Sequence, residues 1–110
     1  MIKVKYNTTK NLLTIKGHAG YAETGKDIIC ASASMIYYNL LAMLRQYPDE
    51  AFAVPLKVKT AKSKNATTSI ECVPSEAYET LIYHDFLYAL TGFETLMGNY
   101  PEHINLVVTQ

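Results

Sequence analysis

The sequence has no tryptophan and only two cysteines, four prolines and five glycines among its 110 residues. Two cysteines in a chain without a secretion signal point to a reducing compartment rather than to a disulfide framework. A domain of this length buries roughly two-thirds of its unfolded surface, so its core needs neither a disulfide nor a structural metal. We therefore expect one domain covering residues 1–110.

Long apolar segments are also missing. The longest uncharged, apolar-rich run covers residues 28–44 and includes Cys30, Ser32, Ser34 and Asn39. A membrane span needs about 20 predominantly apolar residues, so this run is better explained as a buried helix. The first five residues alternate between apolar and basic and lack the apolar core of a signal peptide. The sequence thus predicts a cytoplasmic protein that has no membrane partner.

Lysine and arginine are absent after residue 64, although the chain has ten basic and ten acidic residues. Residues 1–64 hold every basic residue and four acids, a net charge of +6, and the six remaining acids give the rest −6. This balance argues against a uniformly basic nucleic-acid binder, and a nucleic-acid partner is not expected. The lysines on the predicted strands either maintain solubility and protect sheet edges or form a phosphate-contacting face. Both interpretations concern Lys3, Lys5, Lys16, Lys57, Lys59, Lys62 and Lys64.

Alternating and helical patterns divide the chain into seven elements in the order ββαββαβ. The first helix begins after the N-cap candidate Asp27, and Pro74 and Ser75 mark the start of the second. The predicted strands cover residues 2–6, 13–16, about 56–60, 67–73 and 104–109, and the helices run to about residues 45 and 98. This order favours the α+β class: a two-layer sandwich with a mixed or antiparallel sheet of about five strands and both helices on one face.

The first predicted helix has no charged residue between positions 28 and 44. One sheet cannot cover a whole helix, so its remaining face must meet the second helix, a loop or a second subunit. A homodimer through that face is one of these outcomes.

A cysteine and a histidine flank the loop that leads into the first helix. With Asp27 as N-cap, Cys30 is the third helical residue, where free backbone N–H groups and the positive helix end stabilise a thiolate. His18 lies 12 residues upstream across a glycine-containing loop. This is the arrangement of a cysteine nucleophile with an imidazole base, and the free N–H groups could receive an oxyanion. From spacing alone a buried structural cysteine and a surface histidine remain the commoner explanation.

The residue string favours the catalytic alternative. Gly-His-Ala-Gly-Tyr-Ala at 17–22, followed by Gly-x-Asp-Ile-x-Cys-Ala-x-x-Ser at 25–34, resembles the signature of the ribosomal-processing cysteine protease family, Prp. The resemblance implies that Cys30 is the nucleophile and His18 the general base. It also implies the same small α+β topology, a dimer, a bacterial host and no cofactor.

The implied activity is endoproteolytic removal of the N-terminal extension of a large-subunit ribosomal protein, after a segment with paired aromatics. Phage-type relatives cut leaders of capsid or scaffold proteins, and the sequence leaves that substrate open. A second alternative, from another class, is a non-enzymatic ribosome- or RNA-associated module that uses the lysine-rich sheet face.

Other residues of the motif have supporting roles or structural ones. Asp27 either only caps the helix or also orients His18. Ser34 lies on the same helix face as Cys30 and either supports the site or bonds back to the preceding turn. The loop residues are expected either to form a substrate-contacting lid or an ordinary surface loop. They are Gly17, Ala19, Gly20, Tyr21 and Gly25.

The remaining cysteine and histidines carry no comparable pattern. Cys72 is expected to be a buried hydrophobe in the fourth strand. His84 and His103 share no metal-ligand spacing with each other or with either cysteine, so no metal site is expected.

Overall fold

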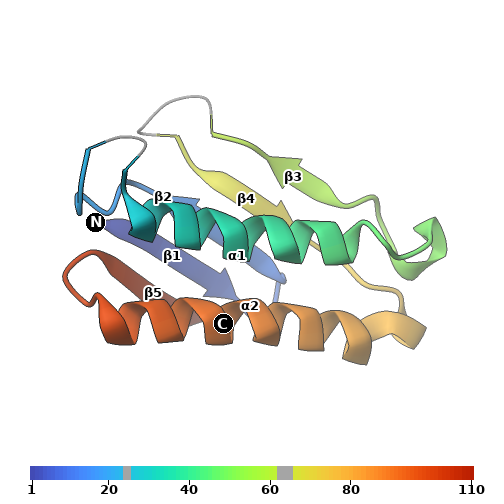
Figure 1. Ribbon diagram of the computed structural model, residues 1–110. Helices are drawn as coiled ribbons and strands as arrows, with labels where there is room; N and C mark the ends of the chain where they lie inside the picture. Colours follow the sequence, from blue (N-terminus) through green and yellow to red (C-terminus); the bar gives the residue numbers. More distant parts are fainter. Residues whose placement is uncertain (24–25, 62–65) are drawn as a thin grey trace.

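The computed structural model describes residues 1–23, 26–61 and 66–110. Its elements follow the predicted ββαββαβ order, with two added 3-10 turns, η1 (Asp49–Ala51) and η2 (Glu76–Tyr78) (Figure 1). The strands are β1 (Ile2–Asn7), β2 (Leu12–Lys16), β3 (Lys57–Lys59), β4 (Thr68–Glu71) and β5 (Ile104–Thr109), and the helices are α1 (Ile28–Leu44) and α2 (Glu79–Asn99).

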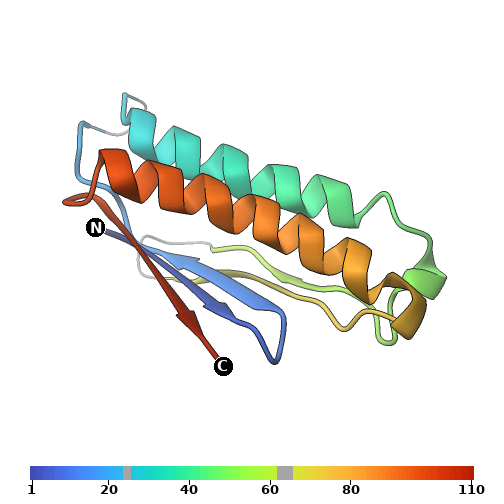
Figure 2. The ribbon, with the colours of Figure 1, turned by 90° about the horizontal axis from the view of Figure 1, so that it is seen from below.

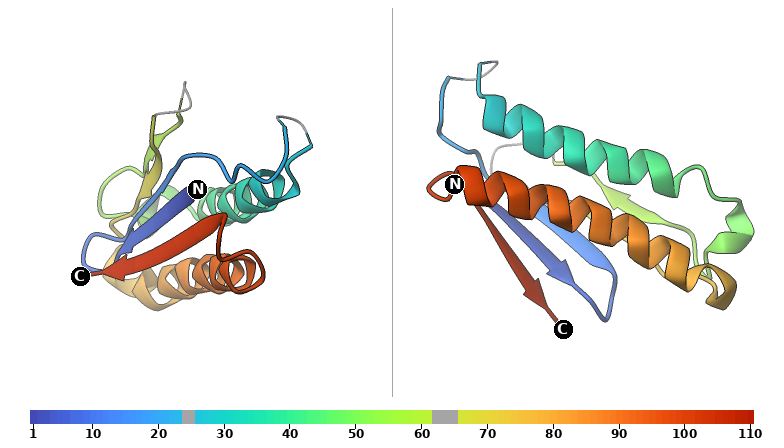
Figure 3. Two further views of the ribbon diagram at one scale, coloured as in Figure 1. Left: turned by 90° about the vertical axis from the view of Figure 1, so that its left-hand side faces the viewer. Right: turned by 60° about the horizontal axis from the view of Figure 1, so that its bottom comes forward.

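The strands form one mixed sheet in the order β3-β4-β2-β1-β5. The first four strands pair antiparallel, whereas β5 returns beside β1 and runs parallel to it. Both helices cover the same face of this sheet, as Figures 2 and 3 show. The predicted two-layer α+β architecture is therefore confirmed. Its parallel β1–β5 pair makes the N-terminal strand an interior strand.

The core lies between the helices and the sheet face that they cover. Along β1, Ile2, Val4 and Tyr6 are buried and the intervening lysines are exposed, as the alternation predicted. Along α2 the buried side chains follow the predicted spacing of three and four. The rings of Tyr6 and Phe86 stack at a centroid distance of 5.3 Å and join the two layers. Burial of each large apolar side chain contributes about 1.5–3 kcal/mol, so this interface supplies most of the driving force for folding.

The start of the second helix differs from the sequence prediction. Ser75 does not cap it, because the Ser75 hydroxyl donates a 2.6 Å hydrogen bond to the Glu50 carbonyl in η1. The chain after Ser75 first forms the 3-10 turn η2, and α2 begins at Glu79. The fourth strand is likewise shorter than predicted. Cys72 follows β4 directly and is only 1% exposed, which confirms its expected place in the core.

The turn that leaves β2 depends on Gly17. Its φ of +97° lies in the left-handed region, and a Cβ there would collide with the carbonyl oxygen of Met1. Only glycine meets both conditions without strain. The absence of a side chain lets the chain pass close to the start of β1 and turn toward His18.

Gly17→Ala should therefore lower the free energy of unfolding by at least about 2 kcal/mol, because left-handed strain and a backbone collision add. Gly98→Ala is the matched control. Gly98 lies near the end of α2, and a Cβ added to it would meet no atom within 4 Å, so alanine there should be neutral or stabilise by up to about 1 kcal/mol. Urea unfolding of both variants measures the difference, and equal midpoints would contradict the close approach of Gly17 to Met1.

Candidate active site

The loop before α1 brings His18 and Cys30 together. Nδ1 of His18 lies 4.0 Å from Sγ of Cys30, and the cysteine occupies the first turn of α1. The imidazole is exposed and the thiol is half-buried. Both side chains face a hollow of about 160 Å³ between α1 and the strands β1, β2 and β4. The two residues singled out from the sequence thus share one surface depression.

Asp27 organises the backbone on both sides of the cysteine. Its Oδ1 accepts hydrogen bonds of 3.0 Å from the N–H groups of Ile29 and Cys30, which caps α1. Its Oδ2 accepts from the N–H groups of Tyr21 and Ala22 in the loop, at 3.0 and 3.4 Å. Burial raises the pKa of this carboxyl, but the four N–H donors outweigh it and hold the pKa below its ordinary value of 3.8. Asp27 therefore has the geometry of the predicted N-cap, and it also anchors the loop. The described hydrogen bonds of its side chain include none to His18.

This capping corrects one expectation about the helix end. The first-turn N–H groups were expected to be free for an oxyanion, but those of Ile29 and Cys30 bind the Asp27 side chain. The N–H of Ala31 binds the Asp27 carbonyl. The donor that points at the sulfur instead belongs to the loop, since the N–H of Ala19 lies 3.4 Å from Sγ of Cys30.

The other motif residues lie around this centre. Ser34 is exposed and lines the hollow one turn after Cys30, and Gly17 lines it from the end of β2. Ala19 is buried, at 3% exposure, whereas Gly20 and Tyr21 are exposed. Gly25 lies outside the described residues.

Three residues near the site were missed by sequence reasoning. Tyr37 and Tyr38 line the hollow, and within the described part of the chain the buried Tyr37 hydroxyl has no hydrogen-bond partner. His103, in the turn before β5, binds the Ala19 carbonyl. The 30, 34 and 37 spacing on one helix face could have indicated Tyr37, but no local signal pointed to His103.

The second cysteine has a different environment. Burial, with a smaller contribution from the charge of Asp85, raises the pKa of the Cys72 thiol to about 11. This thiol is protonated at neutral pH and has no imidazole beside it in the described hydrogen-bond network, so it is suited to packing rather than to nucleophilic attack.

The lysines of the open sheet face gather beside the site. Lys3, Lys5 and Lys16 line a second hollow of about 560 Å³, together with Met1, Thr14, Gly17 and Thr67. Lys3 and Lys16 are direct cross-strand partners. Lys62 and Lys64 of the predicted basic face lie outside the described residues. In residues 1–23, 26–61 and 66–110, no three metal-binding side chains cluster, and neither helix has the length and apolar content to span a membrane.

A cysteine in the first turn of a helix, next to an imidazole and an open hollow on an α+β frame, defines a candidate cysteine hydrolase. The family is shown by comparison. The model of the cysteine protease Prp family matches residues 1–105, and the chain belongs to that family. It is accordingly a cysteine protease.

A sequence relative agrees with this assignment, and two solved structures share the fold. The ribosomal processing cysteine protease Prp of Mycoplasma genitalium is 29% identical over 106 residues, which cover 92% of this chain and 91% of the relative. A crystal structure of the ribosomal processing protease Prp from S. aureus with a covalently linked product peptide superposes with a TM-score of 0.81 at 20% identity. It covers 99% of this chain and 100% of that chain. A complex of the S. aureus protease with a substrate peptide gives a TM-score of 0.68 at 18% identity, over 98% of this chain and 97% of that one.

Asp27→Asn tests the anchoring role of the carboxylate. The folded pKa is lowered relative to the unfolded chain, so the stabilisation is complete above about pH 4 and is lost as the pH falls through the folded pKa. The variant should be less stable than the wild type at pH 7, because an amide cannot accept from all four N–H groups. Its melting temperature should also decline less between about pH 5 and pH 2.5.

Glu94→Gln, at an exposed position of α2, is the control and should retain the wild-type decline. If the melting temperatures of the wild type and Asp27→Asn fall equally with pH over the whole acid range, the role assigned to Asp27 is wrong.

Proposed function

We propose that this protease removes the N-terminal extension of a large-subunit ribosomal protein, with Cys30 as nucleophile and His18 as general base. The observation that carries the proposal is the 4.0 Å approach of the imidazole to the sulfur beside an open hollow, in a chain of the Prp family. The Mycoplasma genitalium relative is named for ribosomal processing, which supports the substrate class. Two free cysteines suit the bacterial cytoplasm in which ribosomes assemble.

The first chemical step forms an acyl-enzyme. As the imidazole closes on the sulfur, His18 takes the thiol proton of Cys30, and the thiolate attacks the scissile carbonyl carbon. The carbonyl oxygen becomes an oxyanion. We assign the N–H of Ala19, which lies beside the sulfur, as its hydrogen-bond donor. When the carbonyl re-forms, the C–N bond breaks and His18 gives its proton to the leaving amine.

The second step releases the leader. Water enters the hollow, His18 removes one of its protons, and the resulting hydroxide attacks the thioester carbon. The second tetrahedral intermediate collapses with cleavage of the C–S bond, and the proton on His18 returns to the sulfur. The enzyme is regenerated, and the reaction as a whole consumes one water.

The surrounding residues receive supporting roles in this proposal. Ser34 and Gly17 form part of the wall against which the substrate backbone lies. Tyr21, which is 47% exposed, offers its ring to substrate aromatics from the loop. Asp27 keeps the loop and the helix start in register and does not take part in proton transfer.

Cys30→Ala should abolish cleavage of a peptide that spans the leader junction of a ribosomal protein, because no other described thiol is near the hollow. Cys72→Ala, which removes the other cysteine, should cleave within about twofold of wild type. His18→Ala should lower kcat/KM by roughly 10²–10⁴-fold, the range for loss of a general base. Mass spectrometry of the products measures all three.

If Cys30→Ala cleaves as fast as the wild type, the nucleophile is wrong. If the wild type cleaves a capsid-type leader and not the ribosomal one, the protease mechanism stands and the substrate class is wrong.

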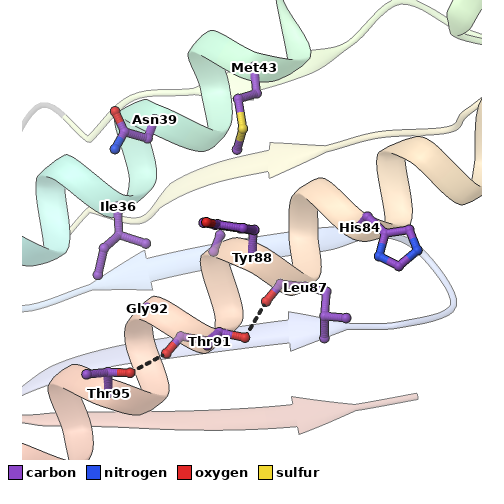
Figure 4. A pocket seen from close by; sticks show the side chains of 10 residues that line it. Ile36, Asn39, Met43, His84, Leu87, Tyr88, Thr91, Gly92 and Thr95 are labelled. Carbon is purple, nitrogen blue, oxygen red and sulfur yellow. Dashed lines mark hydrogen bonds between the residues drawn. The ribbon is translucent and has the colours of Figure 1, made fainter.

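The outer face of the helix pair supports a further part of the proposal, a homodimer. A groove of about 600 Å³ runs between α1 and α2, with Ile36 and Met43 on one side and Tyr88 and Gly92 on the other (Figure 4). Tyr88 is 80% exposed, and Met35 of α1 is 61% exposed. A second copy related by a two-fold axis would place one groove against the other and bury both sets of apolar side chains.

Tyr88→Glu should convert the dimer into a monomer, because a carboxylate in the centre of the groove would lose its hydration in the interface. Tyr83→Glu is the matched control, since Tyr83 is also an exposed tyrosine of α2 but does not line the groove. Light scattering after size exclusion measures both masses. A wild type that remains monomeric at about 0.1 mM, or a Tyr88→Glu variant that stays dimeric, would contradict this interface.

A further inference from the structure

We propose that His103 is a positioning residue of the active site: through its hydrogen bond to the Ala19 carbonyl, it holds the Ala19 N–H on the sulfur of Cys30. This inference rests on the proposed role of Cys30 as the nucleophile. His103 has no described contact with the sulfur or with His18, so it would act through the loop backbone alone.

The hydrogen bond identifies which imidazole nitrogen donates. Nδ1 of His103 lies 2.7 Å from the carbonyl oxygen of Ala19. Because a carbonyl can only accept, Nδ1 must carry the proton and donate it. The donor is held in turn by its own backbone. The N–H of His103 binds the Tyr100 carbonyl, and its carbonyl accepts from Ile2 of β1, each at 2.9 Å.

Ala19 transmits this constraint to the sulfur. Its carbonyl accepts from His103, and its N–H lies 3.4 Å from Sγ of Cys30, so one buried residue is tied on both sides of its Cα. A hydrogen bond to sulfur is much stronger when the sulfur is ionised, so a held N–H favours the thiolate over the thiol. In the proposed mechanism the same N–H also donates to the oxyanion that forms beside the sulfur.

The loop needs an external anchor at this point. Gly17 and Gly20, on either side of Ala19, have φ values of +97° and +68°, and glycines allow many alternative backbone paths. Tyr21 adds a second contact to the same turn, since its ring forms T-shaped pairs with the rings of Tyr100 and His103 at centroid distances of 5.7 and 5.4 Å. Figures 1 and 2 place this turn and the loop at the same end of the molecule.

Two variants separate the hydrogen bond from the aromatic packing. His103→Phe keeps a ring beside Tyr21 and removes the donor. His103→Asn loses the ring but places an amide nitrogen near the position of Nδ1, where it can still donate to Ala19. Tyr83→Phe is the control, because Tyr83 is an exposed ring on α2 that lines neither the hollow beside Cys30 nor the groove between the helices. Circular dichroism and thermal melting establish that each variant is folded.

The first measurement is the rate of Cys30 alkylation by iodoacetamide from about pH 6 to pH 9, read by mass spectrometry of the Cys30 peptide. His103→Phe should alkylate about tenfold more slowly than the wild type near pH 6.5 and approach it at the alkaline end, as expected for loss of a hydrogen bond to a charged group. His103→Asn should stay within about threefold of the wild-type rate, and Tyr83→Phe should alkylate at the wild-type rate. The buried Cys72 serves as the internal reference.

The second measurement is cleavage of the leader peptide. His103→Phe should lower kcat by about tenfold with KM nearly unchanged, since the held N–H acts on the thiolate and the oxyanion rather than on substrate binding. A wild-type alkylation profile and kcat in His103→Phe would overturn the proposal. An equal loss in His103→Asn would also overturn it, as would unfolding of both variants, because His103 would then be a packing residue. If Cys30→Ala still cleaves the peptide, the proposed function fails instead, whatever the alkylation profile.

Discussion

The active-site end of this protein depends on one carboxylate. Asp27 gathers two N–H groups from the first turn of α1 and two from the loop before it, so the helix and the loop share a single acceptor group. These donors hold its pKa below the ordinary value, even though burial opposes ionisation. Without the shared acceptor, Cys30 would sit on a fraying helix end, and Tyr21 and Ala22 of the loop would lose their link to that end.

Capping has a chemical consequence, because a donor that satisfies a carboxylate is lost to substrate. The helix end holds the cysteine in place but offers an oxyanion no free N–H from residues 29 to 31. The available donor is the N–H of Ala19, on the loop side of the sulfur. In the proposed mechanism the site therefore divides its tasks: α1 carries the nucleophile, and the loop carries the base and a backbone donor beside the sulfur.

The sequence was a good guide wherever the relevant interactions are local. The element order, the alternation in β1 and the buried stripe of α2 follow from periodicity, and the approach of His18 to Cys30 follows from a short motif. Prediction was poorer where a side chain had competing partners. Ser75 was expected at a helix start, but its hydroxyl binds the Glu50 carbonyl in another segment, and no local pattern contains that choice. The roles of Ser34 and Tyr21 remain predictions.

The order of the helices and strands, the α+β class and the two residues that meet in the hollow can all be derived from the sequence. The element order and the fold class depend on spacing within a few turns of chain. The pair of residues rests on the family motif, because spacing alone favoured a structural cysteine and a surface histidine. The folded chain was needed to show which backbone donors are occupied and that His103 lies against Ala19, 84 residues away. That contact exists because β5 returns parallel to β1 and so brings the turn before β5 next to the loop. The alternation of residues within a strand does not show which distant strand it pairs with.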